Sequence, residues 1–188
     1  MAKRNTVGYD RVIEMAIKII EDEGPEELTF RNLAKALDIK SQSLYNYFKN
    51  QSELLEELGT QFVRWLHQEL TEGLIGYSGK KALIKYAEII RNYFSERGQS
   101  ISLIHKVKNY DKSSDFFVEM KKVIDLIDRI LDSIDLHGVD KTSFGEGYIS
   151  QILGFLLIEQ LGFLDQYGLP HNDESFRQML ELSTKIID

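Results

Sequence analysis

Apolar residues recur at intervals of three and four along almost the whole chain, which is the spacing of one face of an α-helix. Only two prolines, Pro25 and Pro170, occur among the 188 residues, so long helices can form nearly everywhere. Apolar residues make up 43% of the sequence, which is enough for a packed core. We therefore predict an all-α fold.

The stretch from Leu28 to Leu55 predicts two short helices joined by a tight turn, followed by the start of a third helix. Thr29 is suited to begin the first helix, because its hydroxyl can accept a hydrogen bond from a backbone N–H of the next turn. The second helix is predicted from about residue 41 to residue 48, with Leu44 and Phe48 four residues apart and facing inward. This arrangement is a helix-turn-helix.

The second helix of such a unit can lie in the major groove of DNA, and its outward residues here suit that position. A glutamine can donate and accept hydrogen bonds with adenine, serines can pair with several base edges, and tyrosine hydroxyls can reach phosphates. These outward residues are Ser41, Gln42, Ser43, Tyr45, Asn46 and Tyr47. An ordinary helical hairpin has the same spacing, so the pattern alone leaves DNA binding open.

Residues 12–55 resemble the DNA-binding domain of the TetR/AcrR family of bacterial transcriptional repressors. The run from Leu44 to Phe48, Leu-Tyr-Asn-Tyr-Phe, matches the family's Leu-Tyr-x-Tyr-Phe pattern, and Leu28-Thr29 opens the preceding helix as in that family. The resemblance implies a homodimeric transcriptional regulator that binds a palindromic double-stranded DNA operator. Because members of this family are usually repressors, it also implies repression. It also implies release from that operator by a small molecule bound in a C-terminal domain.

The resemblance and the side-chain chemistry together predict which residues contact DNA. Base edges are assigned to the residues that begin the second helix: Ser41, Gln42 and Ser43. Phosphate contacts are assigned to polar and basic residues around them: Thr29, Arg31, Lys40, Tyr45, Asn46, Tyr47 and Lys49.

The sequence departs from the family pattern at three positions. Asp38 lies in the turn where the family usually has Gly; if that backbone is left-handed, Asp is one of the few other residues that tolerate it. Gln42 replaces a small residue or Gly, so base preferences of relatives do not carry over to this chain. Gln51 stands where Lys is frequent, and we expect Lys49 to make the corresponding phosphate contact.

The net charge of −7 looks unsuited to DNA, but its distribution is uneven. Residues 1–50 hold eight Lys or Arg and eight Asp or Glu, so the remaining 138 residues carry the whole negative charge. The basic residues expected near the DNA are Lys3, Arg4, Arg31, Lys35, Lys40 and Lys49. We therefore expect local positive charge at the DNA face, with an acidic body that disfavours promiscuous binding.

Helical spacing also divides the chain into domains. Residues 1–50 are predicted to form a three-helix DNA-binding head, and a helix over about 51–74 connects it to a C-terminal ligand-binding and dimerisation domain, residues 75–188. Outside the helix-turn-helix, the predicted helices span about 10–23, 51–74, 80–96, 100–108, 114–134, 141–164 and 173–187.

The helix predicted at 141–164 is apolar almost all round, and such a helix must be covered on both sides. One side can face its own core, and we expect the other to face a second copy of the chain. Together with the last helix it would form a four-helix bundle between subunits. The residues assigned to this dimer interface are Ile152, Phe155, Leu156, Phe163, Phe176 and Leu180.

A small-molecule pocket in the C-terminal domain is implied by the resemblance. Its candidate lining is rich in aromatic residues, which suggests an apolar or aromatic ligand. The candidates are Phe62, Trp65, Tyr86, Tyr93, His105, Tyr110, Phe117, Tyr148 and Gln151.

Motifs for catalysis, metals and cofactors are not found in the sequence. There is no cysteine, and none of the four histidines has a partner at a recognised metal spacing. The pair Gly145-x-Gly147 lacks a preceding strand and a third glycine, and neither a nucleophile elbow nor a phosphate loop occurs. We therefore expect no enzyme activity, no metal and no cofactor.

The longest apolar run, from Ile152 to Ile158, is far shorter than the roughly 20 residues that a membrane-spanning helix needs. No apolar stretch follows the basic residues near the N-terminus, so no signal peptide is visible. We expect a cytoplasmic protein without a membrane partner. The alternative interpretation is an all-α ligand-binding or scaffold protein without specific DNA recognition, which Gln51 and the acidic body favour.

Overall fold

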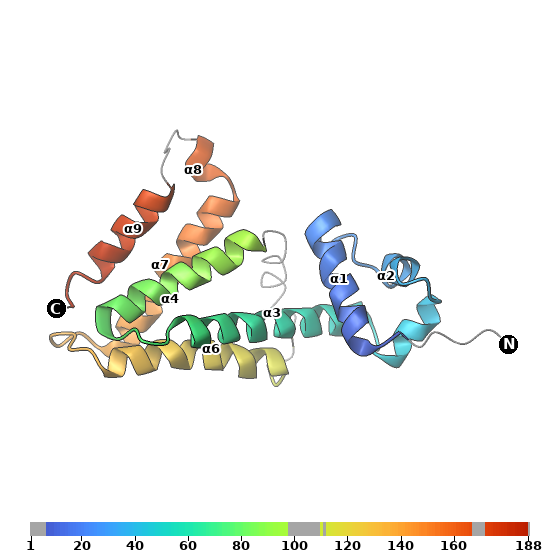
Figure 1. Cartoon of the computed structure of the whole chain (residues 1–188), viewed down its shortest axis with the longest axis horizontal. Coiled ribbons are helices and arrows are strands. Elements are labelled where there is room, and N and C mark those ends of the chain that lie inside the picture. The colour runs from blue at the N-terminus through green and yellow to red at the C-terminus, as the bar shows by residue number, and fades with distance from the viewer. Residues whose placement is uncertain (1–6, 98–109, 111, 167–171, 188) are drawn as a thin grey trace. The chain divides into compact units, whose positions relative to one another are not determined.

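The computed structural model describes residues 7–97, 110, 112–166 and 172–187, and within these ranges the regular elements are helices without any strand (Figure 1). The predicted all-α fold is confirmed. The helix predicted at 100–108 lies outside the described residues. The elements are α1 (Tyr9–Glu23), α2 (Phe30–Ala36), the 3₁₀ helix η1 (Ser41–Asn46), α3 (Gln51–Gly73), α4 (Gly79–Glu96), α6 (Asp115–Asp132), α7 (Lys141–Gln160), α8 (Phe163–Gln166) and α9 (Asn172–Ser183).

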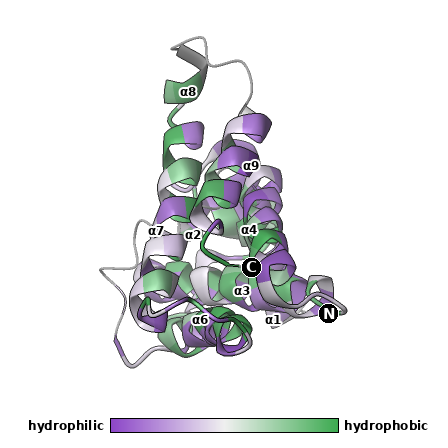
Figure 2. Cartoon of the chain, turned by 90° about the vertical axis from the view of Figure 1, so that its left-hand side faces the viewer, coloured by the Kyte–Doolittle hydropathy of each residue, from purple (hydrophilic) through white to green (hydrophobic). Residues whose placement is uncertain are grey.

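Most of the long helices carry both hydrophilic and hydrophobic residues along their length, as the alternating colours of Figure 2 show. This is the pattern of helices that bury one face and leave the other in water. None of the described helices is both long and apolar enough to cross a lipid bilayer.

The chain divides into two compact units. The head unit comprises Met1–Arg64 and Arg97–Glu119, and the body unit comprises Trp65–Glu96 and Met120–Asp188. This division by contacts differs from the predicted domains, because the first part of α3 and the first turn of α6 belong to the head unit. Spacing along the sequence cannot reveal that difference, since it depends on contacts between distant segments.

Helix α1 forms one wall of the head unit. Val12, Ala16 and Ile20, which are spaced by four residues, are all fully buried. The helix ends at Gly24, whose φ of 93° is readily adopted only by glycine and whose N–H donates to the carbonyl of Ile20 over 3.0 Å. The predicted end of this helix is confirmed.

The turn after α2 is a helix-ending motif with aspartate in the position that usually holds glycine. Asp38 has a φ of 54°, so it lies in the left-handed region, as the sequence suggested. Its N–H donates to Lys35 O over 3.2 Å, and the Ile39 N–H donates to Ala34 O over 3.0 Å. At the other end of α2, the Thr29 hydroxyl accepts from the Asn32 N–H over 3.1 Å, as predicted.

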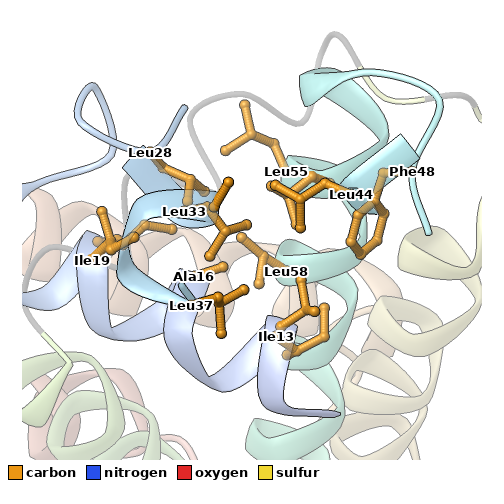
Figure 3. Packing of buried hydrophobic residues seen from close by; sticks show 14 residues of the cluster. Ile13, Ala16, Ile19, Leu28, Leu33, Leu37, Leu44, Phe48, Leu55 and Leu58 are labelled. Carbon is orange, nitrogen blue, oxygen red and sulfur yellow. The ribbon is translucent and has the colours of Figure 1, made fainter. Parts of the chain in front are cut away.

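The second helix of the helix-turn-helix is tighter and shorter than predicted. It is a 3₁₀ helix, and the Ser43 N–H donates to Lys40 O over 2.8 Å. Leu44 and Phe48 are buried as predicted, and they pack with side chains from α1, α2 and α3 (Figure 3). Six residues are too few to hold a helix in water on their own, so this packing keeps the element in place.

Buried tyrosines join the helices of the body unit. The Tyr86 hydroxyl of α4 donates to Val123 O over 3.1 Å, and the Tyr148 hydroxyl of α7 donates to Leu83 O over 2.9 Å. Burial raises the pKa of both hydroxyls, so they stay protonated and can donate. Each tyrosine therefore fills core space and also satisfies its polar tip.

The helix predicted at 141–164 is interrupted. Helix α7 ends at Gln160, and Gly162 has a φ of 68°, which turns the chain before the short helix α8. The left-handed backbone at Gly162 cannot continue a right-handed helix. The sequence signal was the glycine itself, which the apolar residues around it obscured.

Arg91 joins three helices of the body unit. From α4, its guanidinium pairs with Glu159 of α7 at 2.6 Å and with Asp173 of α9 at 2.8 Å. The same group lies 4.9 Å from the ring centre of Phe176 and 5.7 Å from that of Phe155. The hydrogen bond to Glu159 raises the pKa of Arg91, against the opposing effect of burial.

We predict that Arg91→Met destabilises the body unit. Arg91 is 16% exposed, and its removal leaves the half-buried carboxylate of Glu159 without this cation. The expected loss is about 1–3 kcal/mol in the free energy of unfolding, measured by urea denaturation. Lys121→Met is the matched control, because Lys121 is 73% exposed and pairs with Asp125 on the surface, where such pairs contribute less than about 1 kcal/mol. Equal losses for the two variants would contradict the role of Arg91.

Candidate nucleic-acid interface

The buried side of η1 determines which of its residues face water. With Leu44 directed into the core, the side chains of Ser41, Gln42, Tyr45 and Asn46 are exposed, and Lys49 follows them on the surface. Ser43 is half-buried. Half of the ten residues predicted to contact DNA are therefore exposed polar side chains around this buried side, and we call them the reading face (Ser41, Gln42, Tyr45, Asn46 and Lys49).

Tyr45 is held in place by a contact with helix α2. Its ring is 55% exposed and contacts Phe30 of α2 edge to face, with ring centres 5.0 Å apart. This contact restrains the ring, while more than half of the side chain stays exposed to solvent. The geometry suits donation to a phosphate oxygen.

Cations surround the reading face. Arg31 and Lys35 are exposed on α2, and Lys40 is exposed directly before η1. Thr29 is half-buried, and because its oxygen accepts from Asn32, the hydroxyl proton is still available for donation. These groups place positive charge and donors beside the residues that can read bases.

Lys49 is available to contact DNA, whereas Gln51 forms a hydrogen bond within the head. The Lys49 ammonium lies 3.9 Å from Glu53 in an exposed pair, a weak interaction that a phosphate can replace. Gln51 instead donates from its Nε2 to the carbonyl of Leu28 over 2.6 Å, which ties the start of α3 to the segment before α2. Gln51 therefore has a structural role within the head.

Tyr47 differs from the predicted phosphate contact. It is half-buried, and its hydroxyl donates to the carbonyl of Val7, forty residues earlier in the chain. Its ring centre lies 6.2 Å from that of Tyr9. Helical spacing could not predict this hydrogen bond, because the bond joins the end of η1 to a segment that precedes α1.

The predicted pocket residues are distributed over both units. In the body unit, Tyr86, Tyr93 and Tyr148 are fully buried core residues, Trp65 is half-buried and Gln151 is exposed. The head unit contains Phe62, Tyr110 and Phe117, and the Tyr110 hydroxyl donates to Leu55 O over 3.1 Å. His105 lies outside the described residues. The hydrogen-bonded tyrosines are occupied by structural roles, so they are poorly placed to receive a ligand.

One predicted pocket residue lines a hollow in the body unit. An open depression of about 550 Å³ lies between α7 and α9, and the Gln151 side chain accepts a hydrogen bond from the Ser183 hydroxyl there. The other lining residues are Ser175, Gln178, Met179 and Leu182. In the part of the chain that the structure describes, no group of three His, Asp or Glu side chains could hold a metal ion.

The residues assigned to a dimer interface need correction. Four of them are buried inside the single chain, where they cannot meet a partner: Ile152, Leu156, Phe176 and Leu180. Phe155 is half-buried and packs on Phe176 with ring centres 5.0 Å apart, while Phe163 is exposed. The large apolar residues that α7, α8 and the turn between them expose are Leu153, Leu157, Ile158, Leu161 and Phe163. The sequence could not separate these two sides, because apolar residues surround α7 and no periodicity marks its inner face.

Comparisons with known proteins agree with the geometry of the head. Residues 12–58 match the family described as "Bacterial regulatory proteins, tetR family". The repressor KstR2 of Mycolicibacterium smegmatis, described as an HTH-type transcriptional repressor, is 33% identical over 57 residues. That match covers 30% of this chain and 28% of KstR2, so the chain matches less than a third of this curated relative.

Solved structures extend the likeness in fold to nearly the whole chain. A protein of unknown function from Rhodococcus sp. RHA1 superposes with a TM-score of 0.83 at 16% identity, covering 99% of both chains. BioQ, solved with its natural double-stranded DNA operator, superposes with a TM-score of 0.62 at 20% identity, covering 95% of this chain and 96% of BioQ.

The family match falls on the segment that contains the reading face, and the full-length structural matches share the all-helical fold around it. The sequence resemblance to this family is confirmed. Over residues 12–58, the chain is similar to the TetR family of bacterial regulatory proteins.

Proposed function

We propose that this protein is a dimeric transcriptional regulator that binds a palindromic double-stranded DNA operator through its reading face. The observation that carries the proposal is the burial of Leu44 and Phe48, which turns Gln42, Tyr45 and their neighbours outward. The description of KstR2 as a repressor and the complex of BioQ with its operator support it.

Within this proposal, some residues give sequence specificity by contacting bases, and others give affinity by contacting phosphates. Gln42 pairs with a base edge in the major groove, where its amide can both donate and accept, and Ser41 and Ser43 contribute further base contacts. Phosphates are held by the surrounding donors and cations, which fix the register but do not distinguish sequences. These donors are Thr29, Arg31, Lys40, Tyr45, Asn46 and Lys49.

A second copy of the chain covers the exposed apolar face of α7 and α8 in this proposal. A two-fold dimer presents two reading faces, so its operator has two half-sites related by symmetry and separated by about one helical turn or somewhat more. Leu153, Leu157 and Leu161 follow one another at four-residue intervals on this face, and all three are exposed in the single chain.

We also propose that the protein represses transcription and that a small molecule relieves this repression. A ligand shifts the protein away from DNA only if it binds the DNA-free conformation more tightly than the DNA-bound one. The TetR family is one of regulators rather than enzymes, and we propose binding rather than turnover for this ligand as well.

The proposed function is tested by selecting random duplex DNA on the purified protein at two salt concentrations. We expect a palindromic sequence to be enriched. Weak binding without enrichment, falling steeply with salt, would contradict sequence-specific recognition and would indicate phosphate contacts alone.

The selected duplex then separates the roles of two residues. Gln42→Ala should cost roughly 1–3 kcal/mol of binding free energy and should relax the preference at one base pair of each half-site. Lys49→Ala should weaken all sequences alike and reduce the slope of affinity against salt by about one. A loss that is the same on every sequence for Gln42→Ala would exclude a base-reading role for Gln42.

The dimer surface is tested with a charge on the exposed face of α7. Leu157 is 41% exposed in the single chain, and Leu157→Glu would bury a carboxylate in the proposed interface, so we expect a monomer in sedimentation at micromolar concentration. Ile75→Glu is the matched control, because Ile75 is 77% exposed in the turn between α3 and α4, and this variant should remain dimeric. A dimer that persists in Leu157→Glu would place the interface elsewhere.

A further inference from the structure

Two side-chain amides hold the backbone directly before Thr29. Asn32 of α2 donates from its Nδ2 to the carbonyl of Glu27 over 2.9 Å and to the carboxylate of the same residue over 3.2 Å. Gln51 of α3 donates from its Nε2 to the next carbonyl, that of Leu28, over 2.6 Å. Two consecutive carbonyls are therefore bound from two different helices, and we call Asn32 and Gln51 the amide clamp.

Thr29, the residue that follows the clamped carbonyls, is held by its own bonds as well. Its N–H donates to Glu27 O over 2.9 Å, and its carbonyl accepts from the Leu33 N–H over 2.9 Å. Its hydroxyl oxygen accepts from the Asn32 N–H over 3.1 Å. Leu28 is fully buried, so this segment cannot move away without exposing a core side chain to water. These bonds leave the hydroxyl proton of Thr29 available to an acceptor outside the segment.

The bond from Gln51 suits a role in binding better than a role in stability. The Gln51 side chain is exposed, and a hydrogen bond at the surface adds little to the stability of a fold, because water can replace it. Binding is different, because a donor that is already held in its bound position loses less conformational freedom when it meets its partner. Asn32 holds Thr29 from within α2, whereas Gln51 joins the same segment to a second helix.

We propose that Gln51 is a positioning residue for DNA binding: with Asn32, it holds the backbone before Thr29 so that the threonine hydroxyl is presented to a phosphate oxygen. This inference rests on the proposed function, in which Thr29 is one of the phosphate donors. Gln51 then contributes to affinity only through Thr29, and not through a bond of its own to DNA. Since a hydroxyl is uncharged, this contribution does not involve the release of counterions.

The test is a double-mutant cycle on the selected duplex, measured over a range of salt concentrations. Gln51→Met removes the donor and keeps a side chain of similar length. Thr29→Gly removes the hydroxyl, and glycine is still tolerated at the N-cap of a helix. We expect Gln51→Met to weaken DNA binding about three- to tenfold with an unchanged salt slope. When Thr29 is already glycine, the same substitution should change affinity by less than about 1.5-fold.

Gln68→Met is the matched control. Gln68 is an exposed glutamine of the same helix, but it lies in the body unit and donates to the side chain of Glu72 over 2.9 Å. Its substitution should leave DNA affinity unchanged. Additive losses for Gln51→Met and Thr29→Gly would mean that Gln51 bonds to DNA itself. Parental affinity in Gln51→Met would mean that its amide serves the fold alone, and either result overturns the positioning role.

A measurement without DNA separates this inference from the proposed function. Hydrogen exchange of the Thr29 amide, followed by NMR, should be faster in Gln51→Met than in the parent protein and unchanged in Gln68→Met. If the parent protein selects no DNA, the proposed function fails and the positioning role fails with it, whatever the exchange rates. If the parent selects DNA but the Thr29 amide exchanges at the same rate in all three proteins, only the positioning role is overturned.

Discussion

The burial of Leu44 and Phe48 is the constraint on which the DNA-reading part of the molecule depends. The helix that carries Leu44 and closely precedes Phe48 has only six residues, and its own hydrogen bonds cannot keep it ordered in water. Its orientation therefore comes from the core formed with α1, α2 and α3 (Figure 3). Since the two buried side chains are four residues apart, their burial also determines which polar residues face outward, among them Gln42 and Tyr45.

Local features of the sequence predicted most of the head correctly. Thr29 begins α2, Gly24 ends α1, and Asp38 adopts the left-handed backbone that the turn requires. Each of these depends on the chemistry of one residue and its nearest neighbours, which a sequence displays directly. The all-α fold was predictable for the same reason, since apolar spacing is a local property. The 3₁₀ geometry of η1 was not, because the same residues suit an ordinary α-helical turn.

Features that depend on distant contacts could not be predicted in the same way. The bond from Tyr47 to Val7 and the ion pairs of Arg91 join segments far apart in sequence. Helix α7 is apolar on most of its surface, so its pattern does not show that Leu156 faces the core while Leu157 faces out. Aromatic residues predicted to surround a ligand proved in several cases to be core residues, because composition alone does not distinguish a pocket lining from a filled interior.

The most direct test of the account is amide hydrogen exchange of the protein with and without the selected duplex. The account predicts slower exchange in the presence of DNA at residues 29–31 and 40–49, which include the reading face and its phosphate donors. The addition of DNA should slow amide exchange in helices α4 and α9 much less. Protection confined to the body unit, or no protection of residues 40–49 at a DNA concentration that saturates binding, would contradict recognition through this face.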